Sequence, residues 1–180
     1  MHVDDLILNV GQFLDEDTNV MIGSVEVNML SDNMPINLEN LTAVVDFNFH
    51  LYNMNYFSDT DQLPIITDEL SEEEAYLINT LNDTQAFFIH DHLVMTISDF
   101  NWSENYYSLE NKMLILTKFI HYCKYNNYDY LALMVGKEAE KKLEDTNVTE
   151  FPKVKQYEAL GFERINIHQT PVMVKNLNEK

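Results

Sequence analysis

One stretch constrains the fold more than any other: a long amphipathic segment that leads directly into a short apolar run. In residues 109–126 the apolar side chains recur at helical spacing, at Leu109, Met113, Leu116, Ile120 and Cys123. Residues 130–135 are rich in β-forming side chains without polar alternation, which is typical of a central strand buried on both faces. A long helix followed by such a strand favours a layered α/β fold.

The segments around this unit extend the same pattern. Further strands are predicted at residues 85–89, 93–100, 162–168 and 171–177. A short helix is predicted over residues 152–160, because a proline stands at its start and Gly161 at its C-terminal cap position. The order strand, long helix, strand, short helix and closing hairpin predicts an α+β fold with a mixed sheet.

Strand patterns also dominate the first third of the chain. They cover residues 5–10, 19–30 and 41–52. In the last of these, Val45, Phe47 and Phe49 alternate with polar residues, as in a half-buried strand. The second pattern changes register near Gly23, which predicts a β-bulge. Residues 53–67 are polar and contain a proline, so we expect a loop there.

A helix is predicted after this loop. Ser71 can cap it, and the acids Glu72, Glu73 and Glu74 occupy its first turn, where they oppose the helix dipole favourably. Glu74 at the third helical position would complete a capping box with Ser71. The acidic run therefore has a structural explanation, and we do not predict a site there.

Size and composition indicate a single domain over residues 1–180, with an acidic strand-rich part (1–68) and a core (69–180). An apolar fraction of 46% can build a core of ordinary density. Cys123 is the only cysteine, so we expect no disulfide framework and no metal site. An acidic N-terminus and the lack of a membrane-spanning apolar run predict a soluble cytoplasmic protein.

The charge is distributed very unevenly along the chain. No lysine or arginine precedes Lys112, whereas the first 111 residues contain 21 Asp and Glu, and the net charge is −19. A surface of this kind repels nucleic acid and anionic lipid, so we expect neither as a partner. It attracts a cationic small molecule or a basic protein. The plainer alternative is a merely acidic, soluble protein.

Three motifs of the C-terminal half follow one another in the order ILTKFIHYCKYNNYDYLALMV, KQYEALGFE and PVMVKNL. In these motifs the C-terminal half resembles the GNAT superfamily of acyl-CoA N-acyltransferases. The motifs are similar to the family's long helix with its central strand, its tyrosine-bearing short helix, and its closing strand. Together they cover roughly residues 93–177. The resemblance implies a GNAT-like fold with acetyl-CoA as cofactor, bound in a V-shaped split between two neighbouring strands.

The resemblance also implies roles for particular residues. Tyr157 stands where many members use a tyrosine as the general acid toward the CoA thiolate; a packed tyrosine is the alternative. Asp99 and Glu104, after the strand at 93–97, are the nearest carboxylates that could accept the amine proton. The cofactor-binding positions are the backbone near Ile97 and, at the start of the long helix, Ser108, Asn111 and Lys112.

The phosphate-binding loop departs from the family's pattern. It falls at residues 107–112 and reads YSLENK, without glycine or arginine and with Glu110 where phosphate should lie. A carboxylate there repels a pyrophosphate, although Lys112 could compensate in part.

Two functions therefore stay open. One is an N-acetyltransferase for a cationic amine, with activity possibly lost. The other is a non-catalytic acidic binding or inhibitor protein, of phage or mobile-element type, on a degenerate GNAT scaffold. It would imitate nucleic-acid phosphates and occupy a basic cleft on a DNA- or RNA-handling protein. The oligomeric state cannot be read from the sequence.

Overall fold

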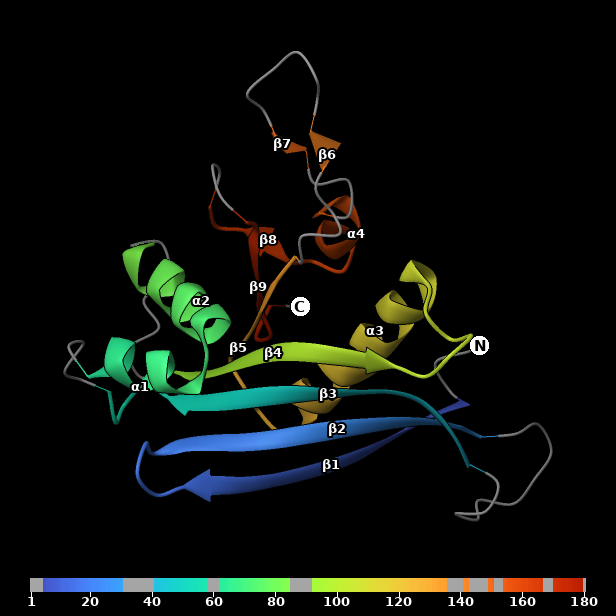
Figure 1. Cartoon of the computed structure of the whole chain (residues 1–180), viewed down its shortest axis with the longest axis horizontal. Helices are drawn as coiled ribbons and strands as arrows, with labels where there is room; N and C mark the ends of the chain where they lie inside the picture. The colour runs from blue at the N-terminus through green and yellow to red at the C-terminus, as the bar shows by residue number, and fades with distance from the viewer. Residues whose placement is uncertain are drawn as a thin grey trace.

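The protein is built on one seven-stranded mixed sheet (Figure 1). The computed structural model describes residues 5–30, 41–57, 62–84, 92–135, 154–166 and 170–179, and the backbone of 141–142 and 149–150. The sheet order is β1-β2-β3-β4-β5-β9-β8. Its strands are β1 (Leu6–Asp15), β2 (Val20–Leu30), β3 (Leu41–Asn53), β4 (Leu93–Trp102), β5 (Tyr130–Met134), β8 (Glu163–Arg164) and β9 (Val172–Asn176). Only β4 and β5 pair in parallel among these neighbours.

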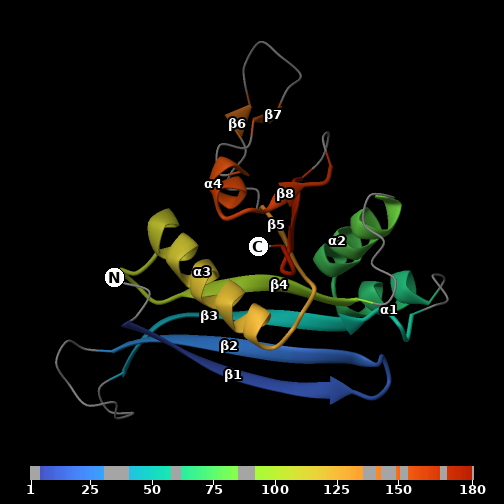
Figure 2. The same cartoon turned by 180° about the vertical axis from the view of Figure 1, so that it is seen from behind.

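In the part of the chain that the structure describes, two pairs of helices flank the sheet. They are α1 (Leu63–Leu70), α2 (Glu72–Asp83), α3 (Leu109–Tyr125) and α4 (Val154–Ala159). A separate two-stranded ribbon consists of β6 (Lys141–Lys142) and β7 (Thr149–Glu150). The helices α1 and α2 lie on the face seen in Figure 1, and α3 covers the face seen in Figure 2. The predicted α+β fold, with a mixed sheet and a strand-rich acidic N-terminal part, is confirmed.

Each face of the sheet has its own core. On the α3 side, Phe47 and Phe49 of β3 and Met95 of β4 pack with Phe119 of α3. On the other side, the apolar residues of α2 pack on strand residues that point the opposite way, such as Tyr52. The predicted central strand is confirmed: in β5, Leu131 and Leu133 belong to the α3 core and Ala132 belongs to the α2 core.

Two details of the N-terminal part differ from the prediction. β2 pairs with β1 and β3 in regular register through Gly23, and the register shift lies between Val27 and Asn28 instead. Gly23 is needed because its Cα faces the ring of Phe49 and leaves no room for a side chain. The region predicted as a loop at 53–67 also contains the start of α1, which has a proline in its first turn. The strand predicted at 85–89 lies outside the described residues.

The helix ends follow the predicted chemistry with one exception. The Ser71 hydroxyl accepts a hydrogen bond from the backbone amide of Glu74 at 3.0 Å and so caps α2. The Ser108 hydroxyl accepts one from the backbone amide of Asn111 at 3.1 Å and so caps α3. The predicted capping box is incomplete, because the Glu74 carboxylate turns into the protein rather than back to Ser71. Gly161 ends the short helix with a positive φ of 79°, as predicted.

No helix among the described residues is both long enough and apolar enough to cross a membrane.

Candidate active site

The candidate site begins where β4 separates from β5. The parallel pairing runs from Val94 to Ile97 and ends there, while β4 itself continues to Trp102. On its other edge, β4 carries one extra residue against β3, since Asn48 pairs with Ser98 and Asp46 with Asn101. Asp99 within this bulge has a left-handed backbone, with φ of 54°. A bulge bends a strand and increases its twist, so β4 diverges from β5 beyond Ile97.

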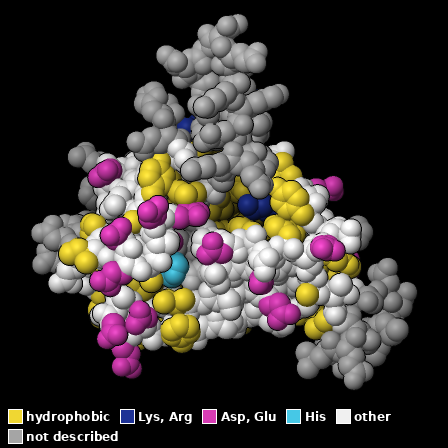
Figure 3. Space-filling model, in the orientation of Figure 1, with side chains coloured by type: hydrophobic (Ala, Val, Ile, Leu, Met, Phe, Trp, Pro, Cys, Tyr) yellow, Lys and Arg dark blue, Asp and Glu magenta, His cyan; other side chains and the backbone are white. Residues whose placement is uncertain are grey.

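A cavity of about 410 Å³ fills this split. It is lined by Glu73 of α2, by Ile97, Ser98, Asp99, Phe100 and Trp102 of β4, by Tyr107, Leu109 and Lys112 around the start of α3, by Met134 and Val135 at the end of β5, and by Tyr157 of α4. Because α2 and α3 lie on opposite faces, the cavity connects the two faces of the sheet through the gap between β4 and β5. Figure 3 shows Lys or Arg atoms in a hollow ringed by hydrophobic side chains, on a face that carries many acids.

The structure brings together four of the residues predicted from the sequence. Ile97, Asp99, Lys112 and Tyr157 all line the cavity, although they come from three different elements. Glu104 does not: it is exposed in the turn after β4, where the amide of Tyr106 bonds to the carbonyl of Ser103. Its predicted role as proton acceptor gains no support from this position.

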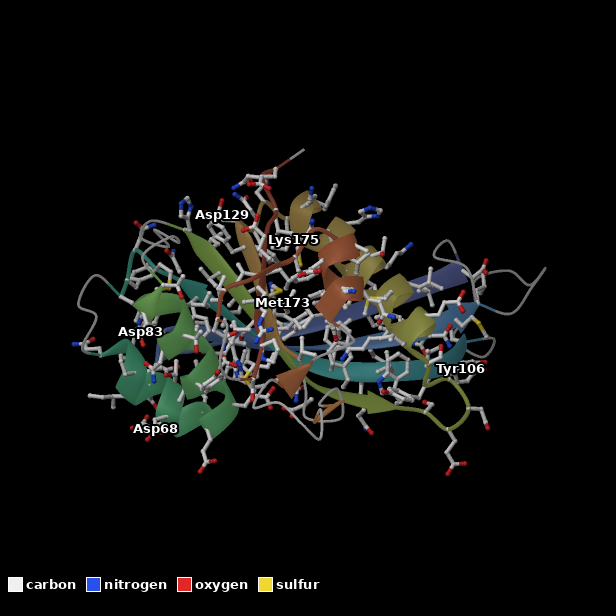
Figure 4. The ribbon with its side chains drawn as sticks, turned by 90° about the horizontal axis from the view of Figure 1, so that it is seen from above. Asp68, Asp83, Tyr106, Asp129, Met173 and Lys175 are labelled. Carbon is white, nitrogen blue, oxygen red and sulfur yellow. The ribbon has the colours of Figure 1, made fainter. Side chains whose placement is uncertain are left out.

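Ser108 and Asn111 lie at the start of α3 and hold that start together. The Ser108 hydroxyl accepts the amide of Asn111, and the Asn111 side-chain amide donates to the carbonyl of Tyr106 at 2.7 Å. Tyr106 lies beyond the end of β4, on the opposite side of the molecule from Asp68 and Asp83 of α1 and α2 (Figure 4). The backbone amide of Asn111, which could otherwise hold a phosphate, is already bonded to the Ser108 hydroxyl, and Glu110 is exposed in the same turn. The predicted cofactor roles of both residues stay predictions.

Glu73 is a cavity residue that sequence reasoning missed. Partial removal from water raises the pKa of its carboxyl, the nearby Asp99 and Glu74 raise it further, and Lys112 lowers it. The local pattern explains Glu73 fully as a first-turn acid, so no sequence signal distinguishes it from Glu72. Only the packing of α2 over the split brings it to the cavity. A carboxylate with a raised pKa is a better proton acceptor than an ordinary one.

Tyr157 lies on the other side of the split from Glu73. It is buried, with 2% of its surface exposed, and its ring meets Phe162 edge-on at 6.0 Å between centroids. Burial and the neighbouring Tyr107 raise its pKa to about 12. The phenol is therefore protonated at neutral pH, as a general acid must be, although the raised pKa makes it a weaker acid than an ordinary tyrosine.

Lys112 reaches from α3 across the cavity. Its ammonium nitrogen lies 4.2 Å from the ring centroid of Phe100 and 5.8 Å from that of Tyr157. Such contacts with the faces of aromatic rings stabilise a cation by roughly 0.5–2 kcal/mol, depending on solvation. Among the described residues that line the cavity, Lys112 is the only basic one.

An acidic trough continues from the cavity across the open face of β2, β3 and β4. It has a volume of about 430 Å³ and is lined by Ser24, Val25, Glu26, Asp46, Phe47, Asn48, Asp99 and Asn101. Asp99 belongs to both hollows. Glu26 and Asp46 are direct cross-strand partners, and like charges in that arrangement destabilise a sheet. A cation lying in the trough would offset that repulsion.

No group of three or more potential metal ligands is found in the part of the chain that the structure describes.

No protein-family model matches this sequence, and a comparison with curated proteins also gives no match. Several solved structures are similar in fold. NAA60 of Arabidopsis thaliana, in complex with acetyl-CoA, is 13% identical over 88% of this chain and 77% of its own, with a TM-score of 0.44. FeeM, an N-acyl amino acid synthase from uncultured soil microbes, is 12% identical over 94% of this chain and 77% of its own, with a TM-score of 0.42.

An N-acetyltransferase from Staphylococcus aureus Mu50 is 9% identical over 96% of this chain and 99% of its own, with a TM-score of 0.41. At these values the likeness is one of fold alone.

Proposed function

We propose that the protein transfers an acyl group from acyl-CoA to a cationic amine in the cavity between β4 and β5. The observation that carries this proposal is the arrangement of the cavity. It places two carboxylates, Glu73 and Asp99, and a protonated phenol, Tyr157, around one space that reaches both faces of the sheet.

In this mechanism the amine first loses a proton to Glu73 or Asp99, directly or through water. The neutral amine then attacks the thioester carbonyl, which lies against the edge of β4 that pairing with β5 no longer covers beyond Ile97. The carbon–sulfur bond breaks, the proton of Tyr157 goes to the departing thiolate, and the second proton of the amine nitrogen restores the Tyr157 phenol. The products are an amide and free CoA.

The two ends of the donor fit this chain unequally. The split and its apolar lining suit the acyl and pantetheine portion of acyl-CoA. The start of α3 suits a pyrophosphate poorly, since Ser108 already binds the Asn111 amide and Glu110 is exposed in the first turn. We therefore expect weaker donor binding than a glycine-rich phosphate loop would give.

The acceptor is expected to be positively charged. Asp99 joins the cavity to the trough that contains Glu26 and Asp46, so a cationic chain could lie in the trough with its terminal amine in the cavity. Electrostatic attraction of this kind raises the rate of association and weakens as salt is added.

The test combines binding and turnover. Acetyl-CoA at millimolar concentration should raise the melting temperature, and a panel of polyamines and lysine peptides should release free CoA thiol. Tyr157→Phe, Asp99→Asn and Glu73→Gln should each lower turnover, by about 100-fold where the residue transfers a proton. Glu72→Gln, one residue away on α2 and outside the cavity lining, is the matched control for Glu73. Glu104→Gln should have little effect. Absence of both a thermal shift and thiol release would rule the enzyme out.

The second candidate is the acidic binding protein on a GNAT-like scaffold. The start of α3 favours it, because its capping contacts and Glu110 are those of an ordinary helix end rather than a phosphate site. Co-purification of a basic nucleic-acid-handling protein, lost when the trough residues Glu26 and Asp46 are neutralised, would support this function if acetyl-CoA gives no thermal shift.

A further inference from the structure

The cavity contains an amine of its own. Lys112 extends from α3 toward β4, and its ammonium nitrogen lies over the Phe100 ring at 4.2 Å. It shares the cavity with Glu73 and Asp99, and its charge acts on the Glu73 carboxyl. The ammonium therefore stands in the same space as the proton acceptors and the uncovered edge of β4.

Tethering gives this amine an advantage over an amine in solution. A nucleophile held in the cavity by its own side chain needs no separate binding step, and proximity of this kind accelerates acyl transfer strongly. Lys112 is partly exposed, so an acyl group attached to it has space within the cavity. Lys118 and Lys124 stand on the same helix but do not line the cavity.

We propose that Lys112 is a self-acylation site, which accepts the acyl group from a thioester bound in the split between β4 and β5. This inference rests on the proposed function, since it requires the donor to bind there. In the step, the Lys112 ammonium gives a proton to Glu73, and the neutral amine forms an amide bond with the acyl carbon. The carbon–sulfur bond breaks, the thiolate takes a proton from Tyr157, and the second proton of the Lys112 nitrogen restores the Tyr157 phenol. No oxidant or further reactant is needed.

The modification would change the cavity. Acylation removes the positive charge of Lys112, which now partly neutralises Glu73 and Asp99, and it ends the cation–π contact with Phe100. The acylated cavity would be more negative than the unmodified one, and a cationic acceptor would bind to it more tightly.

The experiment follows acetyl-CoA incorporation into the full-length chain over time by peptide mapping and mass spectrometry. Lys118 and Lys124 measure the spontaneous chemical reaction of lysines on the same helix. We expect Lys112 to be acetylated at least about tenfold faster than either. Glu73→Gln should slow Lys112 acetylation by about tenfold or more, whereas Glu72→Gln should not. Lys112→Arg keeps the charge over Phe100 and should remove the fast incorporation entirely.

The outcomes separate the two proposals. Fast, Glu73-dependent acetylation of Lys112 supports self-acylation, whether or not free amines are also acetylated. Acetylation of the amine panel with Lys112 no faster than Lys118 and Lys124 overturns self-acylation and leaves the proposed function intact. If neither Lys112 nor any amine is acetylated and acetyl-CoA gives no thermal shift, both proposals are wrong.

Discussion

At the scale of single residues, Glu74 shows most clearly how tertiary packing changes the meaning of a side chain. Only 1% of its surface is exposed, and its carboxylate accepts hydrogen bonds from Tyr52 at 2.7 Å and from Thr96 at 2.5 Å. His50 lies 3.3 Å from its other oxygen. Burial, followed by the charge and hydrogen bond of Glu74, raises the pKa of Tyr52 far above its ordinary value. Glu74 thus ties α2 to β3 and β4.

We predict that Glu74→Ala lowers the free energy of unfolding by about 2–4 kcal/mol, because it leaves two buried hydroxyl groups without an acceptor. Urea denaturation at neutral pH measures the change. Glu72→Ala is the matched control, since Glu72 is exposed in the same turn and contributes at most about 1 kcal/mol through the helix dipole. Equal effects of the two substitutions would contradict the buried role of Glu74.

A second residue-scale prediction concerns Asp129, which joins the start of β4 to the C-terminal residues. Its carboxylate accepts the Leu93 amide and the Asn178 side-chain amide, each at 2.8 Å, and lies 3.5 Å from His92. Partial burial acts in the opposite direction, but these bonds and the histidine lower the pKa of Asp129 below its ordinary 3.8.

Because this pKa is depressed in the folded protein, the stabilisation is complete above the unfolded-state pKa and is lost as the pH falls through the folded-state value. Asp129→Asn should therefore lower stability near pH 7 by on the order of 1 kcal/mol, and the difference from the unsubstituted protein should shrink between about pH 5 and about pH 3. Urea denaturation at several pH values measures both. If the difference in stability between the two proteins does not change with pH, the loss comes from the shape of the asparagine side chain and not from the removed charge.

At the scale of elements, Gly23 shows how two strands and an aromatic ring are fitted together. A side chain on this residue of β2 would overlap the ring of Phe49 on β3 and lie 2.7 Å from the carbonyl oxygen of Gly11 on β1. We predict that Gly23→Ala costs about 1–3 kcal/mol of stability, because the buried Phe49 ring must move.

Gly11→Ala is the matched control. An added methyl at Gly11 would come no closer than 4.0 Å to a neighbouring atom, the Ser24 hydroxyl oxygen. That substitution should be neutral, or stabilising by up to about 1 kcal/mol through the unfolded chain. Thermal unfolding of the two variants separates the effects. If both alanines behave alike, overlap with Phe49 is not the reason for the glycine at position 23.

Element-scale features were also those that the sequence predicted best. Local periodicity and capping residues sufficed for β3, α2, α3 and β5, because each buries one regular stripe or a continuous run. α1 was missed because its N-cap Gln62 makes no side-chain cap bond and because Pro64, which stands in its first turn, is equally typical of a loop. The bulge was placed in β2, whereas β4 carries the one that opens the site, at a position where alternation alone gave no signal.

The candidate site was predictable only in part. Tyr157 and Lys112 followed from the family resemblance, and Asp99 from its place near the end of a predicted strand. Glu73 could not be found in this way, because its neighbours in the sequence account for it as a helix-dipole acid. The aromatic lining at Trp102 and Tyr107 depends on the divergence of β4 from β5, which is a property of the assembled sheet.

At the scale of the whole molecule, charge is segregated along with the fold. The residues that precede the first lysine form β1–β4, α1 and α2, and they contain 21 acids. On the face seen in Figure 3, acidic side chains form many separate patches, which are densest on the left of the view. Repulsion within such a surface destabilises the compact state, and dissolved ions screen it over about 10 Å at 0.1 M salt.

We therefore predict that the melting temperature rises by roughly 2–4 °C, equivalent to about 1 kcal/mol, between about 20 mM and about 500 mM NaCl. Chloride is preferred to sulfate, because sulfate also strengthens apolar burial and would mask the effect of screening.

Glu26→Gln tests whether this change originates in the trough. It removes one half of the like-charged pair with Asp46, while the glutamine oxygen can still accept the Asn28 side-chain amide. The variant should be more stable than the unsubstituted protein at low salt, by a few tenths of a kcal/mol, and the gain should fade at high salt. A melting temperature that is constant or falls with NaCl would mean that the acids are spaced too widely to repel one another, and the trough would then have little attraction for a cationic acceptor.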